Sequence, residues 1–173
     1  DQLRQVVGEE PVEELLVLSP FYDPDAAALQ AMLDALKPKK SVLLIQPDFV
    51  LLNPVIVQQV VDAYAGHVAI HPFARGGDHR YVHAKCYLVK TATRAICLHG
   101  SPNLSRVAML RRAQHGNVEL ANLLEGERNA FDYLFGDLEI GPPTSNVIDL
   151  VAEARTENEE AVTAGQWYLT RGE

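Results

Sequence analysis

The sequence has few of the residues that stabilise disulfide-rich proteins or build membrane spans. Its 173 residues include two cysteines, Cys86 and Cys97, which do not make a disulfide scaffold. No apolar run approaches the roughly 20 residues that a transmembrane helix needs. Basic residues are also in the minority, because 15 lysines and arginines stand against 23 acidic residues. The resulting net charge of −8 argues, at first sight, against a polyanionic partner such as nucleic acid.

What remains is the composition of an ordinary globular protein, with 47% hydrophobic and 22% charged residues. A chain of this length is expected to form one domain with a real core, since chains near 150 residues bury roughly 70% of their unfolded surface. The chain begins at Asp1 and has no basic region followed by an apolar one. We therefore expect no secretory signal, and a cytoplasmic domain cut from a longer protein rather than a processed chain.

Apolar runs that predict buried strands alternate with segments of helical spacing in the first half of the chain. The predicted strands cover residues 13–19, 41–46 and 67–73. Asp23-Pro24 and Asn53-Pro54 have the cap-then-proline pattern that starts helices, and Pro38 and Gly66 would end them. This order of strands and helices is typical of a parallel sheet with covering helices.

The pattern changes in the second half. Residues 81–90 and 94–99 are predicted strands of a hairpin with its turn at 91–93, and 117–124 is a further predicted strand. Helices are predicted within 126–138, with Phe131, Leu134 and Phe135 inward, and from a cap at Thr144, Ser145 or Asn146 to Ala154. Residues 166–170 could add a short strand.

The expected fold is therefore α/β, with a mixed, mostly parallel β-sheet flanked by helices on both faces. Residues 1–12 are polar and linker-like, and we expect a linker or N-terminal extension there. Residues 13–140 would form the domain, and residues 141–173 a C-terminal helix and acidic tail that pack on it.

A histidine and a lysine occur together in the first predicted strand of the hairpin. Alternation along residues 81–90 places His83, Lys85 and Tyr87 on one face, with Cys86 on the other. Burying a lysine is costly unless it has an anionic partner, and no acidic residue occurs between Cys86 and Val118. An anion from outside the chain is a natural candidate for that partner.

The loop after the hairpin suits a phosphate. It offers a glycine that allows close backbone approach, two hydroxyls and a carboxamide, from Gly100, Ser101, Ser105 and Asn103. We expect this loop to open a helix, whose N-terminus would favour an anion, although Ser105 could instead serve only as the helix cap. Asn117 and Glu119 lie two residues apart on the next predicted strand and so share a face.

Together these motifs resemble the signature of the phospholipase D superfamily, H-x-K-x4-D-x6-G-S-x-N. His83-Ala84-Lys85 matches its start and Gly100-Ser101-Pro102-Asn103 its end, while residues 19–23 and 117–119 have counterparts in the superfamily. Two features depart from the pattern. The motif aspartate falls on Lys90, and the gap between Lys85 and Gly100 holds 14 residues instead of 11, which a longer hairpin turn would explain.

The resemblance implies a metal-independent phosphodiesterase without a cofactor. In such an enzyme a neutral imidazole attacks phosphorus to form a phosphohistidine, and a second histidine protonates the leaving oxygen and then activates water. His83 would be the nucleophile or the acid/base, Lys85 and Asn103 would bind phosphate, and Glu119 would orient His83. Further substrate contacts would come from Gly100, Ser101, Ser105, Asn117, His79 and Arg80.

The implied mechanism needs two histidines, and the chain holds one copy of the motif. Either two copies meet across a two-fold axis, as in a homodimer, or the second motif lies in another part of a longer protein. A compact domain with one motif resembles the nuclease branch of the superfamily, which includes dimeric endonucleases, restriction enzymes and helicase-associated domains.

The local charge favours a nucleic acid, and DNA first, as the partner. Between Arg75 and Arg112 there are eight basic residues and one acidic residue, a local net charge of +7. Two alternatives stay open. The chain could be a non-catalytic nucleic-acid-binding or dimerisation module of a larger protein, or a phospholipid-active phosphodiesterase, although no apolar entry patch for a membrane is evident.

Overall fold

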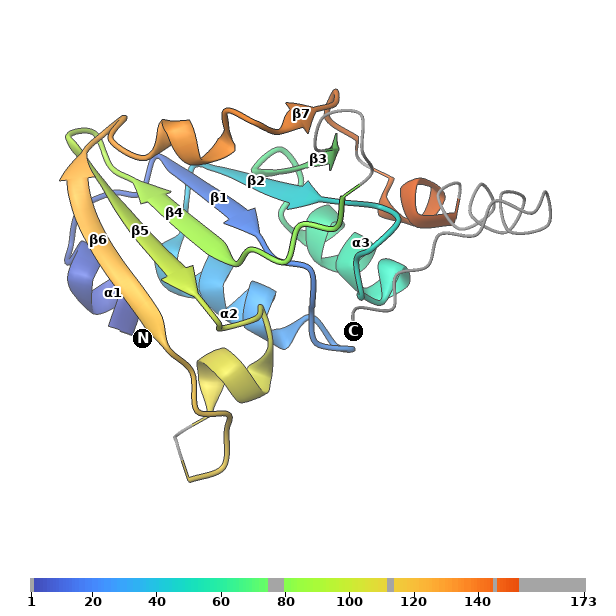
Figure 1. The fold of residues 1–173 in the computed structure, drawn as a ribbon, viewed down its shortest axis with the longest axis horizontal. Coiled ribbons are helices and arrows are strands. Elements are labelled where there is room, and N and C mark those ends of the chain that lie inside the picture. The colour runs from blue at the N-terminus through green and yellow to red at the C-terminus, as the bar shows by residue number, and fades with distance from the viewer. Residues whose placement is uncertain (1, 75–79, 112–113, 145, 153–173) are drawn as a thin grey trace.

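A mixed β-sheet runs through the part of the chain that the computed structural model describes, residues 2–74, 80–111, 114–144 and 146–152. Its seven strands lie in the order β6-β5-β4-β1-β2-β3-β7 (Figure 1). Their bounds are β1 (Glu14–Leu18), β2 (Lys40–Ile45), β3 (Val68–Ala74), β4 (Cys86–Lys90), β5 (Arg94–Gly100), β6 (Ala121–Glu127) and β7 (Glu139–Ile140).

The sheet joins a parallel part to an antiparallel part. Strands β1, β2 and β3 pair in parallel through helical crossovers, as the sequence predicts. Strand β4 runs antiparallel to β1, and β5 and β6 continue the antiparallel order, as does β7 beside β3. The α/β class is thus confirmed, but a mostly parallel sheet is not. The short turn after β4 returns the chain at once, and such a connection can only join antiparallel strands.

The α-helices cover one face of this sheet (Figure 1). They are α1 (Gln2–Val7), α2 (Ala27–Leu36) and α3 (Pro54–Ala63). Two short helices follow later, a π-helix η1 (Arg106–Leu110) and a 3₁₀ helix η2 (Asp132–Phe135). The α-helical face encloses the larger core, in which Leu29 and Val57 pack with inward residues of the strands such as Leu43.

The opposite face of the sheet is covered by the segment that carries η2. Phe131 and Phe135 pack there on Leu88 and Cys97, as predicted, but Leu134 is partly exposed. The predicted helix within residues 126–138 is wrong, because only one 3₁₀ turn forms within that range. Helices on both faces are therefore not confirmed.

The two crossover helices show how local signals set their ends. Helix α3 begins at Pro54, and the Asn53 side chain accepts a hydrogen bond from the Ile56 N–H at 3.4 Å, as the cap pattern predicts. Helix α2 begins at Ala27 rather than at Pro24. Asp23 still accepts a hydrogen bond from its first turn, from the Ala28 N–H at 2.8 Å.

The described chain ends pack on the domain. Within the expected linker or N-terminal extension of residues 1–12, α1 folds and Val7 and Val12 are buried in the core. Residues 147–152 are helical, and Asn146 caps them by accepting from the Asp149 N–H at 3.0 Å. The acidic tail and the predicted strand at 166–170 lie outside the described residues. Within the described ranges, no helix has the length and apolarity needed to cross a membrane.

Candidate active site

The predicted site residues gather at one end of the sheet, where β1 ends and β4 begins. Antiparallel pairing sets Leu18 opposite Cys86, and the Gly100 N–H at the end of β5 donates to the Lys85 carbonyl at 3.2 Å. The register therefore brings the His83 segment and the Gly100 loop together. The predicted strand 81–90 is shorter than expected, because β4 begins at Cys86 and leaves His83 in an extended lead-in.

His83 and Lys85 contact each other directly. The Lys85 Nζ lies 2.8 Å from Nε2 and 3.1 Å from Nδ1 of His83, and it donates to the His83 carbonyl at 3.0 Å. A ring nitrogen can accept from an ammonium group only when it carries no proton. The contact thus fits a neutral imidazole beside a charged lysine.

The electrostatics of the pair point the same way. Burial, followed by the neighbouring Lys85 charge, lowers the pKa of His83 below its usual value. Burial also lowers the pKa of Lys85, while the negative charge of Glu119 acts in the opposite direction. Both effects on His83 favour a ring that is unprotonated, and therefore nucleophilic, near neutral pH.

Lys85 is buried, with 5% of its surface exposed, as the sequence predicts. Among the described residues, no carboxylate lies within ion-pair distance of its Nζ. A cation left without a counter-charge in a buried position is costly, and such groups usually serve a ligand or a reaction.

The Gly100 loop is clamped to the segment before β6. Gly100 has a φ of +150°, and a Cβ atom at this position would lie 2.3 Å from the Leu120 carbonyl oxygen, so only glycine fits. The Ser101 N–H donates to that carbonyl at 2.9 Å, and the Leu120 N–H donates to Ser101 Oγ at 2.9 Å. The predicted strand 117–124 begins only at Ala121, because the residues before it pair with this loop.

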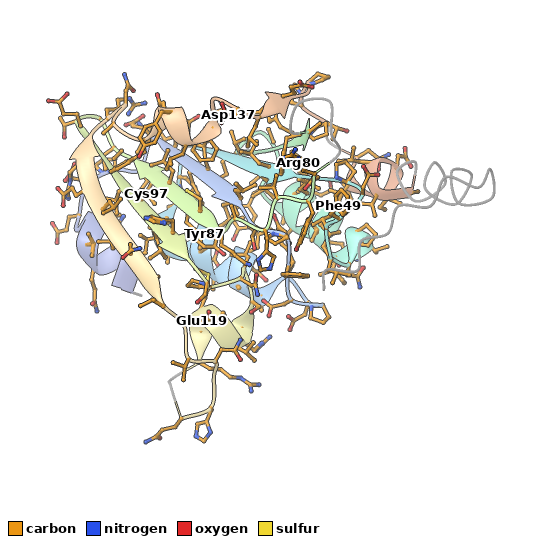
Figure 2. All side chains as sticks on the ribbon, in the orientation of Figure 1. Phe49, Arg80, Tyr87, Cys97, Glu119 and Asp137 are labelled. Carbon is orange, nitrogen blue, oxygen red and sulfur yellow. The ribbon has the colours of Figure 1, made fainter. Side chains whose placement is uncertain are left out.

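Glu119 binds the same loop rather than His83. Its carboxylate accepts hydrogen bonds from the Ser101 hydroxyl and from Asn117 Nδ2, the latter at 3.1 Å. Figure 2 labels Glu119 near the end of β5. Asn117 and Glu119 therefore share a side, as predicted, although not on a strand. In the described structure the ring nitrogens of His83 face Lys85, and Glu119 accepts a hydrogen bond from Ser101 where we expected it to orient His83.

Three residues whose roles the sequence leaves unspecified support the loop from the core. Tyr87 Oη donates to the Pro102 carbonyl at 2.9 Å, and the Leu104 N–H donates to Ser19 Oγ at 3.1 Å. Asp23 accepts from the Arg106 N–H. The Ser19 and Asp23 segment is part of the resemblance, but only the fold shows that it acts as a brace.

Asn103 lies within this loop, and one polar atom of its side chain has no hydrogen-bond partner among the described residues. This atom is the buried Oδ1. Buried polar groups are normally paired, and this oxygen accepts hydrogen bonds, so it suits a donor group of a ligand, whereas a phosphate oxygen would bind the Nδ2 amide. Ser105 stands just before η1, and its side chain makes no cap hydrogen bond there.

Aromatic rings also line the site. Ring centroids of Phe21 and Tyr81 lie 5.8 and 5.4 Å from that of His83. The Phe21 ring also lies 5.8 Å from Lys85 Nζ. Sequence reasoning missed both residues, because nothing in their local sequence shows that they meet His83.

Three positions of the sequence analysis remain, Arg80, His79 and Lys90. The Arg80 side chain is exposed, and its carbonyl accepts from Gln46 Nε2 at 2.7 Å, while His79 lies outside the described residues. Lys90 is at the opposite end of β4 from Lys85, 2.5 Å from Asp132. The hairpin turn is short, so a longer turn is not confirmed as the cause of the unusual spacing.

The described residues contain no cluster of histidine, cysteine and acidic side chains that could hold a metal ion. Cys86 and Cys97 are buried on the sheet face away from Tyr87, as predicted for Cys86, with their Sγ atoms 3.6 Å apart. The chemistry that this site offers is therefore that of an imidazole, an ammonium group and amide and hydroxyl donors.

Comparison of the chain with models of protein families finds no match, and comparison with curated proteins also finds no match. The resemblance to the phospholipase D superfamily thus rests on the motif residues of the sequence.

Proposed function

We propose that the chain is a metal-independent phosphodiesterase of the phospholipase D type, and that it cleaves DNA. The observation that carries this proposal is the buried Lys85 amino group, which lies 2.8 Å from a ring nitrogen of His83 and has no carboxylate within ion-pair distance among the described residues. A phosphodiester would supply the missing anion. It would also place phosphorus beside the ring nitrogen.

In the proposed reaction, an unprotonated ring nitrogen of His83 attacks phosphorus. A nitrogen–phosphorus bond forms as the bond to the leaving oxygen breaks, and a second imidazolium gives that oxygen a proton. Water then attacks phosphorus and loses its proton to the second imidazole, and His83 leaves. Lys85 and the Asn103 amide would stabilise the charge on the non-bridging oxygens.

The second imidazole would come from another copy of the motif. We propose a homodimer with the two sites facing each other, or a second motif elsewhere in a longer protein. Val118 and Leu120 support the dimer, because they flank Glu119 and are 95% and 81% exposed. Apolar side chains this exposed beside a site are typical of an interaction surface.

DNA is the favoured substrate because the segment of sequence that carries the motif is basic while the rest of the chain is acidic. Arg75–Arg112 carries +7, so the remaining 135 residues carry −15 to give the total of −8. Phosphate backbones are natural partners of a basic segment, and the acidic remainder would discourage binding elsewhere. A cytoplasmic location accords with this substrate.

The departure at Lys90 does not favour a non-catalytic module. Lys90 is separated from the site by the length of β4, and its charge is paired with Asp132 and, at 4.0 Å, with Glu14. Its contacts are those of a residue that stabilises the fold, so replacing the motif aspartate leaves the proposed chemistry intact.

The proposal is tested by the hydrolysis of bis(p-nitrophenyl) phosphate in EDTA. Wild-type protein should release p-nitrophenol, and His83→Ala should lower the rate by about 10²–10⁴-fold. His115→Ala is the matched control, because His115 is exposed. Equal hydrolysis by wild type and His83→Ala would overturn the catalytic assignment.

A further inference from the structure

A row of aromatic rings leads away from His83 along the surface of the site. The Tyr81 ring centroid lies 5.4 Å from that of His83 and 5.4 Å from that of Phe49, with the Tyr81 and Phe49 rings inclined by 38°. The rings come from segments far apart in sequence, since Phe49 follows β2 and Tyr81 precedes β4. The fold thus assembles an aromatic surface next to the proposed nucleophile.

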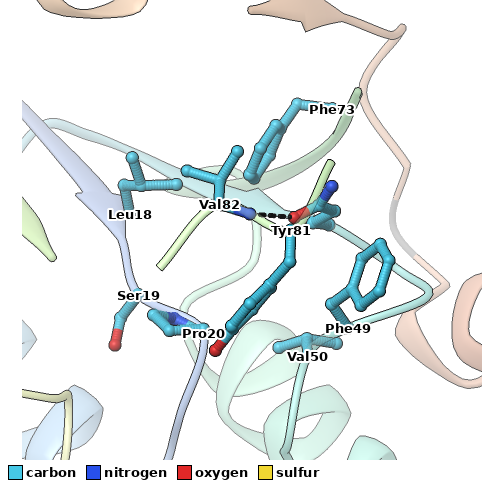
Figure 3. A pocket seen from close by; sticks show the side chains of 9 residues that line it. Leu18, Ser19, Pro20, Phe49, Val50, Phe73, Tyr81 and Val82 are labelled. Carbon is cyan, nitrogen blue, oxygen red and sulfur yellow. Dashed lines mark hydrogen bonds between the residues drawn. The ribbon is translucent and has the colours of Figure 1, made fainter. Parts of the chain in front are cut away.

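The backbone on both sides of Tyr81 is fixed by one side chain. Gln46 is buried, donates from Nε2 to the Arg80 carbonyl at 2.7 Å and accepts at Oε1 from the Val82 N–H at 2.9 Å. A small pocket lies beside the Tyr81 ring, and Pro20, Phe49 and Val50 are among its lining residues (Figure 3). The ring is therefore held in place before any ligand arrives.

Tyr81 keeps 39% of its surface exposed in spite of these contacts. An ordered aromatic ring that is partly open to solvent can offer its surface to a flat ligand. Base–aromatic stacking contributes about 1–3 kcal/mol per base and tolerates any base, because every base has a π-face. In a nucleic acid held with phosphorus at His83, only the sugar separates that phosphate from the flanking base.

We propose that Tyr81, supported by Phe49, is a stacking platform for the base of the nucleotide that flanks the scissile phosphate. The inference rests on the proposed function and adds a substrate preference to it. A base can reach this platform only when it has left its own helical stack, so the enzyme acts on single-stranded or locally unpaired nucleic acid. Tyr81 acts in substrate binding, with no part in the proton transfers.

The test compares Tyr81→Leu, which removes the ring, with Tyr81→Phe, which keeps it. The substrates are a single-stranded oligonucleotide and the same strand with an abasic site at the flanking nucleotide, both in EDTA. Tyr81→Leu should lower kcat/KM on the normal strand by roughly 5- to 150-fold, which is the stacking free energy expressed as a rate. Tyr81→Phe should retain most of the rate, and all three proteins should cleave the abasic strand equally.

An equal loss on both strands would overturn the proposal, because Tyr81 would then act by positioning His83. An unchanged rate for Tyr81→Leu on the normal strand would also overturn it, as would equal cleavage of duplex and single strand. If wild type cleaves neither strand, the proposed function is wrong, and a binding measurement then tests the stacking role of Tyr81 separately. Fluorescence of a 2-aminopurine base at the flanking position should then be quenched by wild type and Tyr81→Phe, and quenching retained by Tyr81→Leu would contradict stacking.

Discussion

The two ends of the β4–β5 hairpin treat their buried cations differently. At the turn end, Lys90 lies 2.5 Å from Asp132, and Arg94 pairs with Glu10 and Glu125, each at 2.6 Å. At the opposite end, Lys85 is equally buried but contacts His83 instead of a carboxylate. The two lysines are five residues apart in the sequence, so the contrast belongs to their surroundings.

This difference separates a structural cation from one that is available for binding. Where the chain supplies carboxylates, the charge is neutralised within the fold and the local geometry is stabilised. Where no carboxylate lies within ion-pair distance, burial and the ammonium group both lower the pKa of the neighbouring imidazole, and an outside anion could pair with the lysine. Exchanging or removing each charge in turn tests this interpretation.

The largest effect is expected from Lys85→Met. This change removes the proposed phosphate ligand, so diester hydrolysis in EDTA should fall by about 10²–10³-fold. The free energy of unfolding should stay constant or rise, because the variant no longer buries an ammonium group without a carboxylate partner. Rate assays and chemical denaturation on the same preparation check both parts. A stable Lys85→Met protein with an unchanged rate would contradict the assignment of Lys85 as the lysine that binds phosphate.

Lys90→Met is expected to lower the stability of the protein and to leave the rate of hydrolysis unchanged. It leaves Asp132 without this cation, while Glu14 keeps Lys40 at 3.3 Å, so the free energy of unfolding should fall by about 1–2 kcal/mol, a moderate value because Asp132 is half exposed. The hydrolysis rate per folded molecule should match that of wild type. Denaturation midpoints give the first quantity, and assays well below the melting temperature give the second. A rate loss comparable to that of Lys85→Met would contradict the structural role.

The smallest expected effect is a pKa shift in Glu119→Gln. The Glu119 charge raises the pKa of Lys85 against the opposing effect of burial, so its removal should lower that pKa further. The lysine would then lose its proton at a lower pH than in wild type. Carbon-13 NMR titration of the lysine Cε signals measures this shift. Glu125→Gln is the matched control, because Glu125 pairs with Arg94 at the other end, and an equal shift there would remove the contrast.

The sequence predicts much of the fold where the signals are local. Apolar spacing and a cap-then-proline start predict α3 with its first residue, because the Asn53 cap needs only neighbouring atoms. The strands and the hairpin follow from runs of β-forming residues between turn residues. Helix α1 could not be predicted from the sequence, because its apolar residues are too few to show a period, although Val7 is buried.

The candidate site is predictable only in part. The motif identifies His83 and Lys85, and the lack of nearby acidic residues indicates the missing partner of Lys85. The bracing contacts cannot be predicted in this way, since Ser19 and Leu104 are 85 residues apart. The same holds for the ion pair of Lys90 with Asp132, and for the approach of Phe49 to Tyr81, because tertiary packing alone sets these distances.

The most direct test of the central claim is the stereochemical course at phosphorus. The substrate is a phosphorothioate diester of one configuration, hydrolysed in ¹⁸O-labelled water and EDTA. Attack by His83 followed by attack by water makes two in-line displacements, each inverting the centre, so the account predicts net retention in wild type and no turnover in His83→Ala. Net inversion would contradict the account, because water would then attack phosphorus directly without a phosphohistidine.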